Sequence, residues 1–262
     1  MRILILGCGW LAESFAMHMK HQGHEVWAST TTSEKYHRLK ADGIFSFILD
    51  FDYENFPAQV DLPTQFDFVL NSIPASQKNN VAILENRFTN IKSFYAHMTW
   101  KKQVFLSSIG IYPDKDGVFD ESYADATELS SKLLLAEASM LGLDDTIIYR
   151  LGGLFGKNRV FAKYFSERIC TTGEQPANFV HIDDVIRLLE VASCNALKHT
   201  VYNVVAPLHP KKKDVILASA KKYGYALPLA FEAGDVTQKI VSGRLLLEEL
   251  DYQFVLPDPL QF

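Results

Sequence analysis

Two glycines and a small residue near the start of the chain have the spacing of a phosphate-binding turn. Gly7, Gly9 and Ala12 form the pattern G-x-G-x-x-A directly after an apolar run, and in a strand–turn–helix this pattern indicates dinucleotide binding. Gly7 would allow the tight turn, Gly9 would let a pyrophosphate approach the backbone, and Ala12 would let the helix pack on the strand. Backbone N–H groups at the helix start, including Trp10 and Leu11, would then bind the phosphates.

The end of the second predicted strand indicates which dinucleotide is preferred. An acid at this position usually binds the adenosine ribose and selects NAD, but the strand here ends in Ser29, Thr30 and Thr31. Hydroxyl groups can donate to a 2′-phosphate, and Lys35 and Arg38 in the following helix would add positive charge. We therefore expect NADP, with NAD possible; the alternative is an ordinary helix cap with a solvated basic face.

Two further segments should lie at the same edge of the sheet. Asp50 ends the third predicted strand and would accept a hydrogen bond from the adenine amino group, or else belong to a surface turn. Ser72, Ile73 and Pro74 close the fourth strand at its carboxyl end, where a dinucleotide lies across the crevice. We expect their backbone to contact the cofactor.

Strands and helices alternate through the first half of the chain. Strands are predicted at 2–6, 25–29, 45–49, 66–72, 103–107 and 145–150, and helices at 11–22, 33–41, 81–97 and 128–140. This order predicts an α/β fold, a Rossmann-type doubly wound parallel sheet. Residues 1–151 would form the NAD(P)-binding core. Residues 152–262 would complete it with a strand at about 201–205, interleaved with a small C-terminal substrate lobe.

Composition excludes several other classes of protein. A net charge of −5 gives no reason to expect nucleic acid or an anionic membrane as partner, and no apolar stretch is long enough to span a bilayer. Cys8, Cys170 and Cys194 are far apart, so we expect no disulfide or zinc site, and a cytoplasmic location fits. Asp183 and Asp184 lack a partner at ligand spacing, so we expect no metal and interpret them as a helix start.

Four later segments resemble the extended and atypical short-chain dehydrogenases/reductases, often called the NAD-dependent epimerase/dehydratase group. Residues 104–112 resemble the family's S-S-x-x-V-Y-G segment, although Pro113 replaces the final glycine. Residues 150–156 resemble R-x-x-x-x-Y-G, residues 178–185 resemble R-D-F-V-H-V-D-D-V, and residues 201–204 match a late core strand. With the glycine turn these matches span about residues 1–205. The resemblance implies a sugar or sugar-nucleotide substrate and a possible homodimer.

The resemblance also implies catalytic roles for several residues, but the tyrosine that the family uses for proton transfer is missing. Ser108 aligns with the hydroxyl that binds the substrate oxygen, and Lys132 with the lysine that binds the nicotinamide ribose and lowers the pKa of a tyrosine four residues earlier. Glu128 stands in place of that tyrosine. A carboxylate is a poor proton donor near pH 7 unless burial raises its pKa. Glu128 would form an i, i+4 ion pair with Lys132 or supply the proton, and Tyr112 is the alternative donor.

Two functions follow from these patterns. The first is an oxidoreductase or epimerase that acts on a sugar or sugar nucleotide by reversible hydride transfer. The second is a non-catalytic NADP-binding sensor, which would bind the cofactor without turnover. His181 could contact a substrate in the first case, but we interpret it as a buried histidine that binds neighbouring backbone.

Overall fold

A seven-stranded sheet forms the centre of the computed structural model, which describes residues 1–53, 60–75, 80–232, 234 and 236–261. The strand order is β13-β9-β7-β5-β1-β2-β3, and the pairings among β1, β2, β3, β5 and β7 are parallel. The strands are β1 (Arg2–Leu6), β2 (Glu25–Thr30), β3 (Phe45–Ile48), β5 (Phe68–Asn71), β7 (Gln103–Ser108), β9 (Thr146–Leu151) and β13 (Val201–Val204). The predicted doubly wound α/β fold is confirmed.

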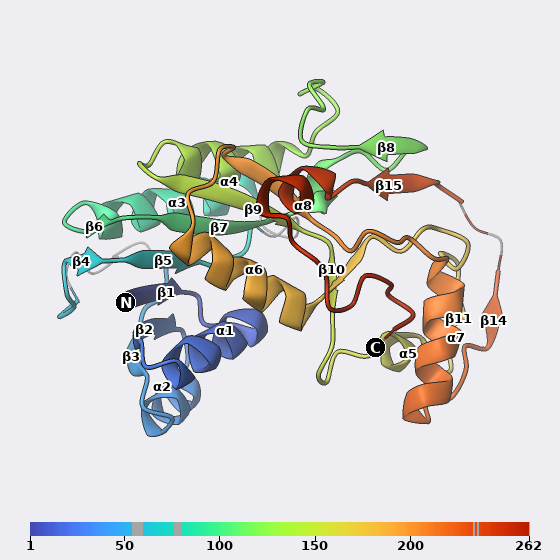
Figure 1. Cartoon of the computed structure of the whole chain (residues 1–262), viewed down its shortest axis with the longest axis horizontal. Helices are drawn as coiled ribbons and strands as arrows, with labels where there is room; N and C mark the ends of the chain where they lie inside the picture. The colour runs from blue at the N-terminus through green and yellow to red at the C-terminus, as the bar shows by residue number, and fades with distance from the viewer. Residues whose placement is uncertain (54–59, 76–79, 233, 235, 262) are drawn as a thin grey trace. The chain divides into compact units, whose positions relative to one another are not determined.

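Helices cover the sheet, α3 and α4 on one face and α1 and α2 on the other (Figure 1). Aromatic pairs fill the layers: Phe15 meets Phe68 edge-on at 5.9 Å between ring centroids, and Phe88 meets Phe105 at 5.7 Å. These four rings are almost fully buried, so they contribute both apolar area and specific geometry. The helices are α1 (Trp10–His21), α2 (Ser33–Ala41), α3 (Val81–Tyr95) and α4 (Ser131–Leu141).

The chain divides into two compact units. The first contains residues 1–107, 130–149 and 188–200, and the second contains 108–129, 150–187 and 201–262. In the second unit β10 pairs with β12, β15 with β8, and β11 with β14. The elements there are β8 (Gly117–Phe119), β10 (Gly153–Phe155), α5 (Phe161–Phe165), β11 (Ile169–Cys170), β12 (Phe179–His181), α7 (Lys212–Tyr223), β14 (Ala230–Phe231), β15 (Lys239–Val241) and α8 (Arg244–Leu250), with α6 (Ile182–Cys194) shared between the units.

Two predicted elements differ from the structure. The strand predicted at 66–72 is divided at Asp67 into two strands. The first, β4 (Gln65–Phe66), pairs with β6 (Thr99–Trp100), and the second, β5, begins at Phe68. The helix predicted from residue 128 begins at Ser131. Asp125 accepts hydrogen bonds from the backbone and hydroxyl of Thr127, and this local turn competes with helix formation.

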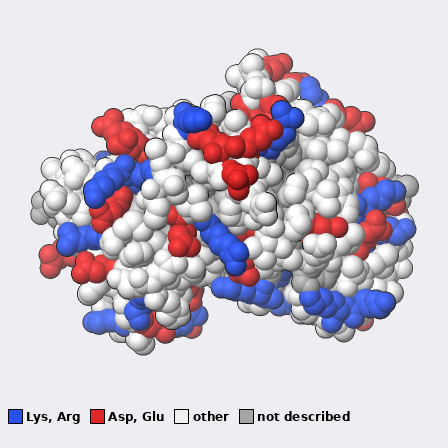
Figure 2. Space-filling view, in the orientation of Figure 1, with Lys and Arg blue, Asp and Glu red and all other residues white. Residues whose placement is uncertain are grey.

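Charged side chains of both signs alternate over the face shown in Figure 2, as the modest net charge suggests. Among the described residues, none of the helices combines the length and the apolar character that a bilayer span requires.

Candidate functional site

The glycine turn between β1 and α1 is built around Gly7. Its φ of +76° lies in the left-handed region, and a Cβ there would come within 2.9 Å of the Ile73 side chain and 3.2 Å of the Ile73 backbone nitrogen. The segment after β5 therefore packs directly against the turn. A side chain at position 7 would be both strained and excluded, which agrees with the predicted need for glycine.

Gly9 is a glycine for a different reason. It is the N-cap of α1, with φ −77° and ψ −166°. Among the described residues, its neighbours in the chain and the helix backbone aside, a Cβ would meet only the Gly7 carbonyl oxygen within 4 Å, at 3.9 Å. The first helical bond runs from Glu13 N–H to the Gly9 carbonyl at 2.8 Å, so the preceding amides have no acceptor inside the helix. Ala12 is fully buried, as the packing of α1 on the sheet requires.

Ser29 of β2 stabilises the turn through two hydrogen bonds. It is 1 % exposed, its Oγ accepts a hydrogen bond from Gly7 N–H at 2.8 Å, and its carbonyl accepts one from Cys8 N–H at 2.8 Å. Thr30 is also buried, whereas Thr31 is exposed. The Ser29 hydroxyl therefore supports the backbone of the turn, and its binding to a 2′-phosphate stays a prediction.

Lys35 and Arg38 converge on one carboxylate that sequence reasoning missed. Lys35 Nζ lies 2.9 Å and Arg38 Nη2 lies 2.8 Å from the same oxygen of Glu13, in the first turn of α1. Burial has the largest effect on the Cys8 thiol and raises its pKa to about 12. Lys35 and Arg38 act in the opposite direction and lower this pKa, so Cys8 lies within reach of both charges. Cys8 is thus a packing residue, and the two cations lie next to the glycine turn.

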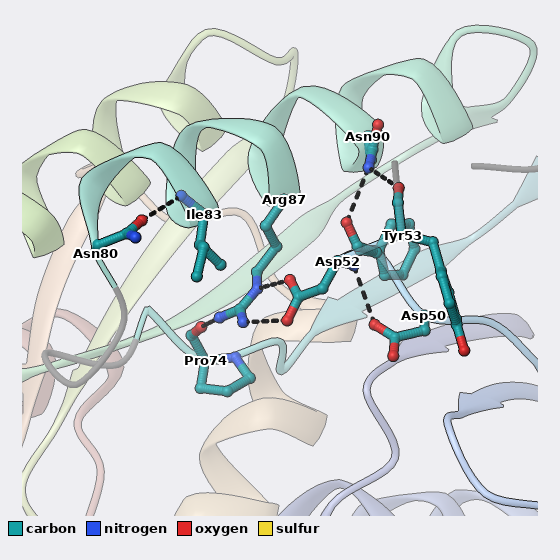
Figure 3. Close-up of polar contacts among 9 residues, drawn as sticks. Asp50, Asp52, Tyr53, Pro74, Asn80, Ile83, Arg87 and Asn90 are labelled. Atoms are coloured by element: carbon teal, nitrogen blue, oxygen red, sulfur yellow. Dashed lines mark hydrogen bonds and ion pairs between the residues drawn. The ribbon is translucent and has the colours of Figure 1, made fainter. Parts of the chain in front are cut away.

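A buried arginine joins the two loops in which Asp50 and Pro74 lie (Figure 3). Arg87 of α3 is 7 % exposed; its Nε and Nη2 each donate to the Asp52 carboxylate at 2.6 Å, and its Nη1 donates to the Pro74 carbonyl at 2.5 Å. Asp50 Oδ1 accepts the backbone N–H of Asp52 at 3.0 Å. The loops after β3 and β5, both expected at the cofactor edge, are therefore fixed to the same helix.

Ser108 and Lys132 lie on regular elements. Ser108 is the last residue of β7, and its Oγ accepts the Gly110 N–H at 3.0 Å. The neighbouring Ser107 hydroxyl donates to the buried Glu137 carboxylate of α4 at 2.5 Å. Lys132 is the second residue of α4 and is half-buried. The Ser107–Glu137 bond, which the sequence motifs did not reveal, fixes the end of β7 to α4.

Tyr112 lies in a buried polar network. It is 2 % exposed, its hydroxyl donates to Asn203 Oδ1 at 2.9 Å, and it accepts from Arg150 Nη1 at 2.9 Å. Burial raises the pKa of Tyr112 despite the nearby guanidinium. Both hydrogen-bonding directions of the hydroxyl are thus used within the second unit, which favours a structural role over the alternative of proton donation.

Tyr112→Phe should destabilise the protein by about 1–3 kcal/mol, because Arg150 and Asn203 would each lose a buried partner. Urea unfolding at pH 7.5 measures this, with Tyr164→Phe, which alters an exposed ring, as control. Unchanged stability together with lost turnover would instead assign Tyr112 to the chemistry.

Glu128 lies in the turn before α4, and this corrects the predicted i, i+4 pair with Lys132. Its carboxylate accepts hydrogen bonds from the Lys115 ammonium and the Tyr123 hydroxyl. The Lys115 bond, followed by that from Tyr123, lowers the pKa of Glu128. An exposed carboxylate with a lowered pKa is ionised at neutral pH, so Glu128 is a poor replacement for the phenol of the family motif.

His181 and the following aspartates are structural. His181 is 8 % exposed, and its Nδ1 accepts the Asp183 N–H at 3.2 Å, while burial lowers its pKa. Asp184 is fully buried and accepts hydrogen bonds from the Tyr252 hydroxyl and from two backbone N–H groups of the C-terminal segment. We expected Asp184 only to favour the start of α6, and its role in anchoring the C-terminus was missed.

The sheet order, the glycine turn and the flanking helices define the fold of the NAD-dependent epimerase/dehydratase group of short-chain dehydrogenases/reductases, which confirms the resemblance seen in the sequence at the level of the fold. No protein-family model matches the chain. Among curated proteins, the chain is 28% identical to Protein YeeZ of Escherichia coli (strain K12). The alignment is 268 residues long and covers 99% of this chain and 97% of that protein.

Solved structures of this group superpose over nearly the whole chain. Human epimerase family protein SDR39U1 with NADPH gives a TM-score of 0.72 at 18% identity, covering 99% of this chain and 96% of that one. The ADP-L-glycero-D-manno-heptose-6-epimerase of Helicobacter pylori gives 0.72 at 16%, covering 99% and 94%. UDP-glucuronic acid 4-epimerase of Bacillus cereus, in complex with UDP-glucuronic acid and NAD, gives 0.70 at 18%, covering 100% and 97%.

Proposed function

We propose that this protein binds a nicotinamide dinucleotide and is an oxidoreductase or epimerase acting on a sugar or sugar nucleotide. The observation that carries the proposal is the open space at Gly9, directly in front of the first-turn amides of α1. Nothing in the described fold requires glycine at that position, whereas a pyrophosphate on the backbone does. The ligands in the structures of similar fold, NADPH in one and NAD with UDP-glucuronic acid in another, support the same proposal.

The residues present fit such a cofactor. Gly9, Trp10 and Leu11 would hold the pyrophosphate at the positive end of α1, and the segment from Ser72 to Pro74 would contact it through the backbone. Asp50 would bind the adenine, and Lys132 the nicotinamide ribose. The bound cofactor supplies a hydride acceptor and donor. Ser108 would orient the substrate oxygen, which gains or loses a proton during the reaction.

A second function, a nicotinamide-dinucleotide sensor without turnover, is favoured by one observation. The position four residues before Lys132 holds a carboxylate paired with Lys115, and the hydroxyl of the other candidate, Tyr112, is engaged on both sides. The two functions differ in one measurement: incubation with NADP⁺ and UDP-glucuronic acid or UDP-glucose, followed for NADPH formation and for epimerised sugar. The enzyme predicts product, whereas the sensor predicts binding alone.

NADPH should bind more tightly than NADH, because Lys35 and Arg38 are held together beside the glycine turn and a 2′-phosphate would replace the single carboxylate of Glu13. A charge-assisted hydrogen bond contributes about 1.5–3 kcal/mol, so Lys35→Met should weaken NADPH about 10- to 150-fold and leave NADH unchanged. Nicotinamide fluorescence titrations measure both affinities.

Lys40→Met is the matched control, since Lys40 lies on the same helix over the Tyr36 ring and away from Glu13. Equal affinity of the wild type for the two nucleotides would contradict the preference for NADP. Absence of binding to either nucleotide would contradict the proposed function itself.

A further inference from the structure

The second unit contains a pocket that begins one residue beyond Ser108. Its volume is about 490 Å³, within the range of small-molecule sites. Every residue of its lining belongs to the second unit. The residues that matter for its chemistry are Asp114, Gln175, Asn178, Phe179, Lys212 and Lys239.

Lys212 brings a positive charge into this pocket and has no direct ion pair among the described residues. It is the first residue of α7 and half-buried, and its Nζ donates to the neutral Gln175 Oε1 at 2.7 Å. Among the residues that the structure describes, none places a carboxylate oxygen within ion-pair distance of this ammonium. Its backbone N–H also donates to the Gln175 carbonyl at 2.9 Å, so the side chain starts from a fixed position.

Lys239 of β15 adds a second ammonium. Its side chain is 13% exposed, and its Nζ donates to the Tyr112 carbonyl at 2.8 Å and to Asp114 Oδ1 at 3.0 Å. Asp114 itself is 91% exposed, so solvent screens its charge. Burial lowers the pKa of Lys212, the Asp114 carboxylate partly opposes this by raising it, and the Lys239 charge lowers it further. Two partly buried ammonium groups that share one exposed carboxylate, Asp114, leave an excess of positive charge that a bound anion would neutralise.

The side chains of Phe179 and Asn178 in the pocket wall are held by contacts within the protein. Phe179 stacks on Phe161 at 4.0 Å between ring centroids. Asn178 donates to the Lys239 carbonyl and accepts from Val241 N–H, both at 2.8 Å. The Asn178 amide is therefore occupied by the backbone of β15, and the positive charge that a ligand would meet comes from the two lysines.

We propose that this pocket binds an anionic group of the substrate, a phosphate or a carboxylate, between Lys212 and Lys239. The inference rests on the proposed function, in which Ser108 binds the substrate oxygen and the pocket next to Ser108 therefore receives the substrate. It narrows the substrate class to phosphorylated or carboxylated sugars and their nucleotide derivatives, and it excludes neutral sugars as tight ligands.

Isothermal titration calorimetry in the presence of NADPH tests the proposal with glucose 1-phosphate, glucuronate and glucose. We expect the wild type to bind at least one of the two anions and not glucose; which anion binds more tightly tells phosphate from carboxylate. Lys212→Met should weaken that binding at least tenfold. Lys211→Met is the matched control, because Lys211 precedes it, is 59% exposed and pairs with Glu174.

Lys239→Met also removes a bond to the Tyr112 carbonyl, so Lys212→Gln serves as the second pocket variant, and melting temperatures verify folding. Anion affinity unchanged in both Lys212 variants, or no anion binding by a wild type that binds NADPH, would overturn the pocket assignment alone. Anion binding by a wild type that does not bind NADPH would support the pocket and overturn the proposed function.

Discussion

Gly9→Ala is expected to abolish dinucleotide binding while leaving the protein folded. Within the part of the chain that the structure describes, a Cβ at this position meets only the Gly7 carbonyl oxygen beyond its immediate neighbours, at 3.9 Å. The backbone has φ −77° and ψ −166°, which any residue adopts. The methyl group would instead occupy the space of the pyrophosphate in front of α1. We expect at least a ~100-fold weaker Kd for NADPH. The free energy of unfolding should fall by no more than about 2 kcal/mol, which is the upper end of the cost of placing alanine at an N-cap.

Fluorescence titration and urea unfolding measure the two quantities on the same preparation. Gly7→Ala is the contrasting variant: its φ of +76° and the 2.9 Å approach to Ile73 should cost both stability and binding. Gly23→Ala controls for backbone strain alone, because its φ is +83° and, its chain neighbours aside, no atom of the described residues lies within 4 Å of a Cβ there. NADPH affinity preserved in Gly9→Ala would contradict the assignment of this turn to a phosphate.

Asp184→Ala is expected to cause a loss of about 3–5 kcal/mol, which is typical when one partner of a buried charged network is removed. The carboxylate is fully buried and accepts from the Tyr252 hydroxyl at 2.9 Å, from Val255 N–H at 2.7 Å and from Leu256 N–H at 3.1 Å. All three donors would lose their partner, so the segment after α8 should detach before the rest of the chain unfolds.

Hydrogen exchange at the Val255 and Leu256 amides reports this local detachment, and urea unfolding gives the global loss. Asp183→Ala is the matched control, because the adjacent side chain is 55% exposed and lies 3.6 Å from His181 Nδ1. Equal losses of stability in the two variants would contradict the anchoring role of Asp184.

The fold was predictable because its signals are local. The apolar runs that became β1 and β7, and the glycines that became the turn at Gly7 and Gly9, are read within a few residues. The start of α4 was not, because Glu128 continues the helical pattern while the turn centred on Asp125 and Thr127 competes with it. Such competition is decided by hydrogen bonds that composition does not reveal.

For the candidate site, the sequence predicts positions but not the contacts that the side chains make. Lys35 and Arg38 were located from the sequence, but Glu13, 22 residues before Lys35 in the chain, was not connected to them. Arg87 was missed for the same reason, since its partners Asp52 and Pro74 belong to other loops. Pairings between distant segments depend on the packing of the sheet, which no local pattern encodes.

The bond between Ser29 and Gly7 limits how nucleotide preference can change by mutation. An acidic residue at position 29 would lose the hydroxyl that holds the turn and would place a charge where the side chain is 1 % exposed. Thr31 is exposed directly after β2, so a ribose-binding carboxylate can be introduced there without disturbing the turn. Under the proposed function, a change of nucleotide preference would therefore be made by substitution at position 31 and not at position 29.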